Sequence, residues 1–289
     1  MTSEVAETVL RGPGSEVRIG DAHPFAIIGE RLNPTGRSKL TEELKAGDMT
    51  TVKADALAQV RAGARVLDVN AGIPGFDEAE MLANVVRAVH DVVDVPLCVD
   101  SSTHEVLEAV LPIVPGKPIV NSVTAEAHAL ERVLPLVARH GAAVIGMAND
   151  EEGISMEPQV RLKAARKIVE AAEAAGIARE DVIIDPLAMP IGAEPRAATA
   201  MVETIRLIRA ELGVNVSCGA SNVSFGMPDR QGIDASFLTF AIAAGMNTAI
   251  TTPLHDRVRK AVLAADLMLG RDEFGSAWIA AHRAGQVSG

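Results

Sequence analysis

The stretch RVLDVN, residues 65–70, decides the predicted fold, because it is an apolar run that turns polar at its end. The amphipathic segment 78–93 follows it, so a strand-like run and a helical run form one unit. This unit recurs along the chain. The strand-like runs are 25–33, 65–70, 97–101, 119–124, 143–147, 182–187, 215–221 and 248–252. The helical segments are 49–62, 78–93, 103–111, 125–140, 158–175, 195–212, 233–244 and 256–269.

Near-continuous apolar strands that alternate with helices indicate a parallel sheet covered by helices. Eight such units within 289 residues favour a closed (β/α)8 TIM barrel over an open doubly wound sheet. A Rossmann-type fold is the alternative, although no GxGxxG fingerprint follows any strand-like run. We therefore predict a single α/β domain over residues 1–289, with its core at about 25–269. Residues 34–48 are expected to form a rim loop, and the tail after Gly270 a terminal extension.

Composition excludes several classes of function. Hydrophobic residues make up 48% of the chain and charged residues 22%, which are ordinary values for a globular protein. The formal net charge of −11 argues against binding to nucleic acid or to anionic membranes. No membrane span and no signal pattern in residues 1–21 are recognised, so we expect a cytoplasmic protein. Cys98 and Cys218 are predicted to be buried thiols in a reducing compartment.

Polar residues gather at the carboxyl ends of the predicted strands, which face the active site in barrels of this type. The second strand ends with Asp68-Val69-Asn70, and the two-residue period of a strand places Asp68 and Asn70 on one side. The other strand-end residues are Asp100, Asn121, Asp185, Ser221 and Asn222. We predict that these carboxylates and carboxamides converge at one mouth of the barrel.

Several kinds of site are compatible with such a mouth. Local helix capping explains residues 101–103 equally well, since a helix is expected to begin there. The seven histidines show no HxxxH or HExxH spacing, while Mg²⁺ or a sugar on the carboxylates stays open. A flat heterocycle fits better, because a carboxylate accepts parallel hydrogen bonds from an amino group and a neighbouring ring N–H, as on a pterin. A carboxamide such as Asn121 both donates and accepts.

Six motifs follow one another along the chain. They are GERLNPTG (29–36), LDVNAG (67–72), CVDSS (98–102), VNSV (120–123), IIDPL (183–187) and GASNVSFG (219–226). Together they resemble the pterin-binding barrel family, and within it the methyltetrahydrofolate:corrinoid methyltransferases and the folate domain of cobalamin-dependent methionine synthase. The resemblance implies methyl transfer between N5 of tetrahydrofolate and the cobalt of a corrinoid. No residue looks like a cobalt ligand, so the cobalamin is expected on a partner corrinoid protein, and the family also implies a homodimer.

The resemblance also assigns roles to individual residues. It implies that Asp100, Asn121 and Asp185 bind the pterin ring. Asn222 matches the asparagine near N5 and is the expected catalytic residue, since a hydrogen bond to N5 would help this poor leaving group depart. The remaining expected folate contacts are Ser221, Asp68, Asn70 and Arg230. For Arg230, a solvated loop charge is the alternative.

Two other functions remain as alternatives. Dihydropteroate synthase shares the barrel and many motifs but typically carries Ser-Arg-Lys at the seventh strand, where this chain has Ser221-Asn222-Val223. A non-catalytic folate-binding subunit is the second alternative. Phe225 and the strand endings GMAND (146–150) and TTPLHD (251–256) depart from the acetogenic methyltransferase. These departures leave the folate site unchanged, but they leave the corrinoid partner and the pathway open. One alternative pathway is demethylation of a methylated growth substrate, with the methyl group passed on to tetrahydrofolate.

Overall fold

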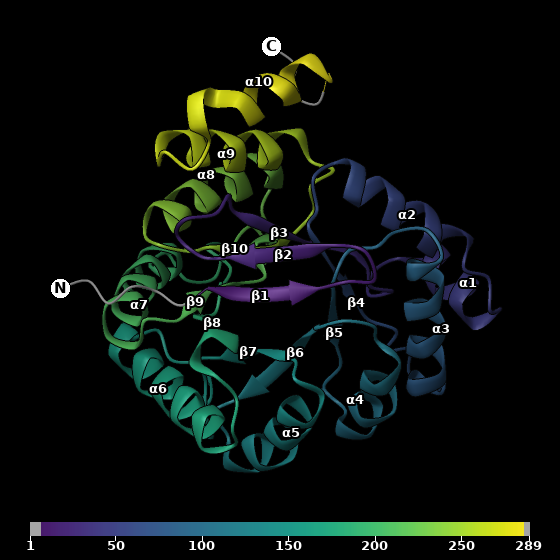
Figure 1. Ribbon diagram of the computed structural model, residues 1–289. Helices are drawn as coiled ribbons and strands as arrows, with labels where there is room; N and C mark the ends of the chain where they lie inside the picture. The colour runs from purple at the N-terminus through teal and green to yellow at the C-terminus, as the bar shows by residue number, and fades with distance from the viewer. Residues whose placement is uncertain (1–6, 286–289) are drawn as a thin grey trace.

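The computed structural model describes residues 7–285, which form a barrel of eight parallel strands surrounded by helices (Figure 1). The barrel strands are β3 (Ala26–Leu32), β4 (Val66–Val69), β5 (Leu97–Asp100), β6 (Ile119–Thr124), β7 (Ala143–Met147), β8 (Val182–Asp185), β9 (Asn215–Val216) and β10 (Thr248–Thr251). The helices around them are α1 (Ser38–Lys45), α2 (Thr50–Arg61), α3 (Glu78–His90), α4 (His104–Val110), α5 (Ala127–His140), α6 (Pro158–Ala174), α7 (Ala197–Leu212), α8 (Arg230–Ala243) and α9 (Asp256–Met268). The predicted (β/α)8 fold is confirmed.

The barrel closes at a seam between β9 and β10. Neighbouring strands pair in parallel from β3 through β9, and β10 pairs with β3. At the seam, single hydrogen bonds replace a ladder: Ile250 N donates to Cys218 O at 2.8 Å, and Asn247 N donates to Val216 O at 3.2 Å. The predicted seventh strand, 215–221, is therefore too long. Its small and polar second half has low strand propensity and ends in the 3₁₀ turn η3 (Ala220–Asn222).

Side chains that point into the barrel are apolar towards the amino-terminal ends of the strands and mostly polar at the carboxyl ends. Strand residues alternate between the interior and the helices. The apolar inward residues that pack together are Ala26, Ile28, Val66, Cys98, Ile119, Ala143, Ile145 and Ile183. Two residues further along each strand, the next inward positions are Glu30, Asp68, Asp100, Asn121, Met147 and Asp185. A mostly polar layer thus rests directly on the apolar interior, at the carboxyl ends of the strands.

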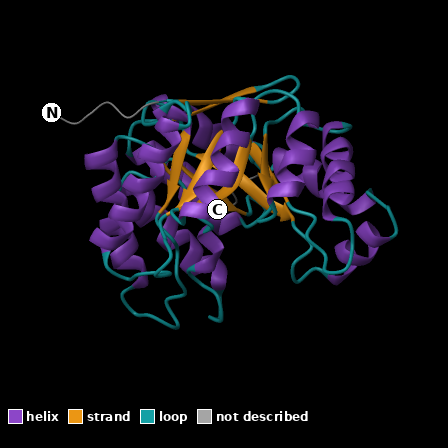
Figure 2. Cartoon of the chain, turned by 90° about the horizontal axis from the view of Figure 1, so that it is seen from below, coloured by secondary structure: helices purple, strands orange, loops and turns teal. Residues whose placement is uncertain are grey.

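A β-hairpin that the sequence analysis did not predict covers the opposite end of the barrel (Figures 1 and 2). Its strands, β1 (Thr8–Arg11) and β2 (Glu16–Ile19), are antiparallel. Leu10, Val17 and Ile19 of the hairpin join the apolar interior cluster. Arg11 exchanges backbone hydrogen bonds with Lys117, just before β6. The hairpin therefore closes the amino-terminal end, and the polar layer faces the other mouth.

The hairpin is expected to contribute strongly to stability. Leu10 is fully buried, so Leu10→Ala should lower the free energy of unfolding by about 2–5 kcal/mol, measured by denaturant titration. Arg18→Ala, on the exposed face of β2, is the control and should change it by less than about 1 kcal/mol. Equal changes in the free energy of unfolding for the two substitutions would show that Leu10 of the hairpin does not pack against the barrel interior.

Other predictions for the chain had mixed outcomes. The expected rim loop 34–48 contains the helix α1, and the tail after Gly270 forms η4 (Glu273–Gly275) and α10 (Ser276–Arg283) beside α9. Cys98 and Cys218 are buried and not disulfide-bonded, as predicted. No helix within residues 7–285 has the length and apolar character needed to cross a membrane. The ends of the predicted domain 1–289 lie outside the described residues, and its boundaries stay a prediction.

Candidate functional site

Contacts across the barrel show that the polar layer points inward. Nδ2 of Asn121 on β6 donates to Oδ1 of Asp68 on β4 at 3.2 Å, although β5 lies between these strands. Asp100 and Asn121 are register partners on β5 and β6. Asp185 on β8 pairs with Met147 of β7, which lines the same cavity as Asn121. Four of the residues expected to bind a ligand therefore lie in one layer.

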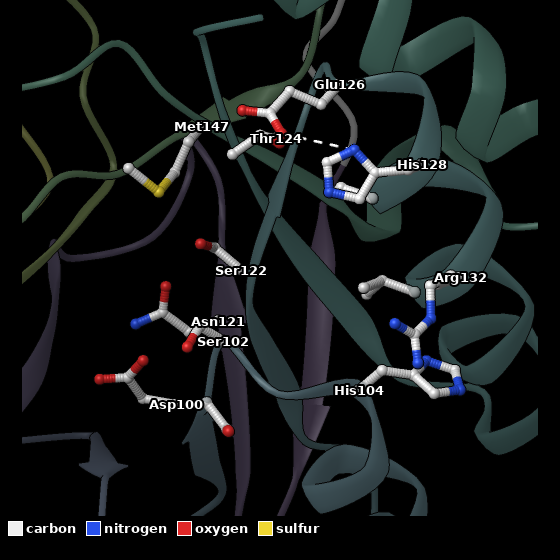
Figure 3. A pocket seen from close by; sticks show the side chains of 13 residues that line it. Asp100, Ser102, His104, Asn121, Ser122, Thr124, Glu126, His128, Arg132 and Met147 are labelled. Atoms are coloured by element: carbon white, nitrogen blue, oxygen red, sulfur yellow. Dashed lines mark ion pairs between the residues drawn. The ribbon is translucent and has the colours of Figure 1, made fainter. Parts of the chain in front are cut away.

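A cavity of about 330 Å³ opens from this layer towards α4 and α5 (Figure 3). Such a volume is sufficient for a small ligand. Figure 3 shows Asp100, Asn121 and Ser122 at one end of the cavity and His104, His128 and Arg132 at the other. Nδ1 of His128 lies 3.5 Å from the Glu126 carboxylate. Asp100 and Asn121 are the predicted site residues that line this cavity, whereas Asp68, Asp185, Ser221 and Asn222 lie outside its lining.

Burial raises the pKa of every carboxyl group in the layer. The pKa of Asp68 lies well above its usual range because of burial and then because of the Asp100 charge. Burial likewise raises the pKa of Asp100 and Glu30. Burial raises the pKa of Asp185 to about 6, against the opposing effects of the Leu187 and Gly219 N–H groups. Clustered buried carboxylates are costly, so this layer favours a ligand that brings hydrogen-bond donors.

Asp68 and Asn70 orient the neighbouring site residues. Asp68 accepts the Nδ2–H of Asn121, which leaves the carbonyl oxygen of Asn121 available to accept from a ligand. Nδ2 of Asn70 donates to the carboxylate of Asp100 at 3.0 Å, while Oδ1 of Asn70 accepts from Gly72 N at 2.9 Å. The polar atoms of Asn70 are thus engaged within the protein. Asn70 therefore orients the Asp100 carboxylate. Direct folate contacts of Asp68 and Asn70 remain predictions.

The loop after β9 is fastened by Ser221 and Arg230. Oγ of Ser221 donates to the carboxylate of Glu30 at 2.8 Å. Arg230, the first residue of α8, donates from Nη2 to Ser221 O at 2.6 Å and from Nε to Ser224 Oγ at 3.0 Å. The Phe225 ring lies 6.0 Å from the same guanidinium, within range of a cation–π contact. Arg230 therefore holds this loop through hydrogen bonds while it remains exposed to solvent, and its folate contact stays a prediction.

Asn222 lies in this loop with its amide exposed to solvent. A methyl group in place of the Gly219 hydrogen would lie 3.0 Å from Nδ2 of Asn222, so the amide rests against Gly219. The N–H of Gly219 in turn acts on the carboxylate of Asp185. Within residues 7–285, no hydrogen bond holds the Asn222 side chain. Its N–H groups are therefore free to donate to a ligand at the edge of the polar layer.

Two residues of the site were given no role from the sequence, although Glu30 is among the polar residues that end the first predicted strand. Glu30 occupies the same inward position in β3 that Asp68 occupies in β4, so the alternation of strand residues could have identified it. Arg161, on α6, acts on Asp185 electrostatically. It lies in an amphipathic helix with no motif around it, and the sequence contains no signal for its role. Among the described side chains, no group of three His, Cys, Asp or Glu residues is arranged to hold a metal ion.

The raised pKa of Asp185 predicts a cost in stability at neutral pH. Since its pKa rises from 3.8 to about 6 on folding, the folded state binds the extra proton between these values. The stability provided by this proton is lost as pH rises through 6, and above it the ionised carboxylate costs up to about 3 kcal/mol. Asp185→Asn should therefore raise the melting temperature of the free protein, more at pH 8 than at pH 5. A melting temperature of Asp185→Asn below that of the wild-type protein at pH 8 would contradict this prediction.

Comparisons with known proteins agree with this architecture. The profile of the family described as "Pterin binding enzyme" matches residues 29–252. A "Methylcorrinoid:tetrahydrofolate methyltransferase" from Eubacterium limosum is 31% identical over 269 residues, covering 90% of this chain and 97% of that protein. Among solved structures, dihydropteroate synthase from Stenotrophomonas maltophilia has a TM-score of 0.67 at 20% identity, covering 90% of this chain and 98% of that one. The Xanthomonas albilineans synthase in complex with 7,8-dihydropteroate gives 0.66 at 21% identity, with the same coverage. These two structural likenesses show the fold alone.

Proposed function

This chain belongs to the pterin-binding enzyme family, and we propose that it transfers a methyl group between N5 of tetrahydrofolate and the cobalt of a corrinoid. The observation that carries the proposal is the free amide of Asn222 beside a layer of buried carboxyl groups. The corrinoid would be presented by a partner protein at the carboxyl-terminal mouth. The name of the Eubacterium limosum relative puts the methyl group on the corrinoid first, and we propose the same direction here.

The polar layer supplies the acceptors that a pterin ring needs. The carboxylates of Asp100 and Asp185 would accept hydrogen bonds from the amino group and ring N–H groups of the pyrimidine edge. Asn121 would accept through Oδ1, since its Nδ2 is directed to Asp68. Hydrogen bonds from such a ligand replace the hydrogen bonds to water that these groups lose when they are buried. The ligand therefore offsets part of the cost that raises their pKa values.

Asn222 would act at N5. When the methyl group leaves N5, negative charge develops on a nitrogen that is a poor leaving group. A hydrogen bond from Nδ2 of Asn222 to N5 strengthens as this charge develops, so it stabilises the transition state more than the ground state. In the reverse direction the N5 lone pair attacks the methyl group and N5 loses its N–H proton to water, so Asn222 would instead accept this N–H through Oδ1 and leave the lone pair free. The corrinoid supplies cobalt as the acceptor or donor of the methyl group.

One specific observation disfavours the synthase alternative. The structures that share the fold include dihydropteroate synthases, so the barrel alone does not discriminate between the two reactions. The turn that follows β9 contains Ala220, Ser221 and Asn222 and carries no cationic side chain. A lysine at this turn is what the synthase resemblance would require. Aminobenzoate and a pterin diphosphate should therefore yield no dihydropteroate with this protein.

The experiment that tests the proposal is a spectroscopic assay of methyl transfer. Tetrahydrofolate with methylcobalamin, and methyltetrahydrofolate with Co(I) cobalamin, are each mixed with the protein while the cobalamin absorbance is followed. A protein-dependent change in both directions is expected. If folate binds but neither free cobalamin nor a corrinoid protein exchanges a methyl group, the chain is a non-catalytic folate-binding subunit.

A further inference from the structure

Arg161 is a buried cation in an unfavourable position. Its side chain is fully buried, and it lies in the first turn of α6 (Pro158–Ala174). The amino-terminal end of a helix carries a partial positive charge, so a cation there is disfavoured. Burying a guanidinium without a carboxylate in contact adds a further cost. Helix formation offsets neither of these two costs. The contacts of the Arg161 side chain must therefore account for an arginine at this position.

The contacts of Arg161 converge on the segment that follows Asp185. Nη1 donates to Pro186 O at 2.7 Å and to Leu187 O at 3.0 Å. Nε donates to Ser155 O at 2.6 Å, so Arg161 also ties the loop before α6 to the same place. Nη2 lies 3.4 Å from Sδ of Met156, so all four acceptors are uncharged. Burial lowers the pKa of this guanidinium, but an arginine side chain stays charged in proteins, so a cation holds the backbone here.

The segment that Arg161 holds presents a hydrogen-bond donor to Asp185. Leu187 has a φ of 69°, in the left-handed region that non-glycine residues rarely adopt. In this conformation, Leu187 N donates to Oδ1 of Asp185 at 2.7 Å. The carbonyl of the same residue accepts from Arg161. Arg161 thus stabilises the turn that orients the Asp185 carboxylate.

Few charged groups surround Asp185. Besides the N–H groups of Leu187 and Gly219, the group in residues 7–285 that favours its ionised form is the Arg161 guanidinium. Just after β9, burial and then the charge of Asp185 raise the pKa of the Cys218 thiol well above its usual range, so this neighbour is neutral. On β7, the register partner is the uncharged Met147. Arg161 therefore supplies the positive charge that, after the Leu187 and Gly219 N–H groups, favours the ionised carboxylate, and it also holds the turn that presents the Leu187 N–H.

We propose that Arg161 is a positioning residue that keeps Asp185 ionised and directed into the polar layer. The part of this inference that has Asp185 bind the pterin rests on the proposed function, and the rest does not. An ionised Asp185 accepts two hydrogen bonds from a ligand edge with adjacent N–H donors, whereas a neutral acid would offer a donor of its own. Arg161 thereby selects for the aminopyrimidine edge over ligands that present acceptors.

Two matched substitutions separate the charge of Arg161 from its hydrogen bonds. Arg161→Lys keeps the charge and loses most of the fork of donors, whereas Arg161→Gln keeps amide donors and loses the charge. The readout is the ¹³Cγ chemical shift of Asp185 in the ligand-free protein as pH is varied, assigned with Asp185→Asn. Trimethylamine N-oxide in all samples favours the folded state of weakened variants.

The titration midpoint of Asp185 should lie at about 6 in the wild-type protein and change little in Arg161→Lys. In Arg161→Gln it should rise by about one to two pH units. Folate affinity at pH 7 should then fall by about 2- to 10-fold in Arg161→Gln and recover above about pH 8.5. Equal midpoints in both variants would overturn the inference, as would an affinity loss that is the same at every pH. If the midpoints separate but the wild-type protein binds no folate, Arg161 has the stated role and the proposed function fails.

Discussion

Asn222→Ala is expected to lower kcat/KM for methyl transfer by about 10²- to 10³-fold, the usual consequence of removing a hydrogen-bond donor from a developing negative charge. The structure supports this prediction because the amide rests on Gly219 and no side chain or backbone group of residues 7–285 forms a hydrogen bond with it. Its donor is therefore available without a rearrangement of the loop. Since the contact matters mainly in the transition state, folate affinity should change by less than about 3-fold. Steady-state kinetics and folate titration of the same preparation provide the two measurements.

Val223→Ala and Ser224→Ala are suitable controls for Asn222→Ala. Val223 and Ser224 follow Asn222 in the same loop but are buried beneath it, so their side chains do not face the mouth. Their substitution tests whether any disturbance of the loop slows transfer. Both controls should retain kcat/KM within about 10-fold. A wild-type rate in Asn222→Ala, with normal folate binding, would remove Asn222 from catalysis.

Asp185→Asn and Asp100→Asn should each weaken folate binding by about 1.5–3 kcal/mol, the value of a hydrogen bond to a charged group. An asparagine retains the shape of the side chain but replaces one acceptor with a donor, which then opposes the N–H groups of the ligand. The loss should therefore appear in the dissociation constant measured by calorimetry. For Asp185→Asn, weaker binding accompanies the gain in stability argued above, because the same buried charge causes both.

Asp181→Asn is a matched control for Asp185→Asn. Asp181 lies immediately before β8, at the amino-terminal end of the strand that Asp185 ends, and it forms an ion pair with Lys117 at 2.6 Å. Its substitution should affect stability but leave folate affinity unchanged within about 2-fold. Equal affinities in Asp185→Asn, Asp181→Asn and the wild-type protein would exclude Asp185 from the folate site.

The barrel was predictable because each repeat carries its own signal. The strands β6 and β7 have the predicted bounds, since each is a run of apolar residues that is bounded by turns. The hairpin was missed because β1 and β2 are only four residues long and are half exposed. Their partner is the barrel interior, which is assembled from distant segments. No local pattern in residues 8–19 identifies that partner.

The candidate site was predictable to the extent that it follows from alternation along the strands. Asp68, Asp100, Asn121 and Asp185 each stand two residues beyond an inward apolar residue, so their convergence follows from strand geometry. The same rule includes Glu30. Arg161 reaches the site from a helix, and its role depends on the conformation of Leu187. A contact such as that of Arg161 with Leu187 depends on tertiary packing, and the spacing of residues in the sequence does not predict it.

A crystal structure of the protein with 5-methyltetrahydrofolate tests the central claim most directly. We predict the pyrimidine edge of the pterin against Asp100, Asn121 and Asp185, with N5 within hydrogen-bond distance of the Asn222 amide. A pterin bound elsewhere would contradict the account. So would a pterin in the polar layer whose N5 faces away from Asn222.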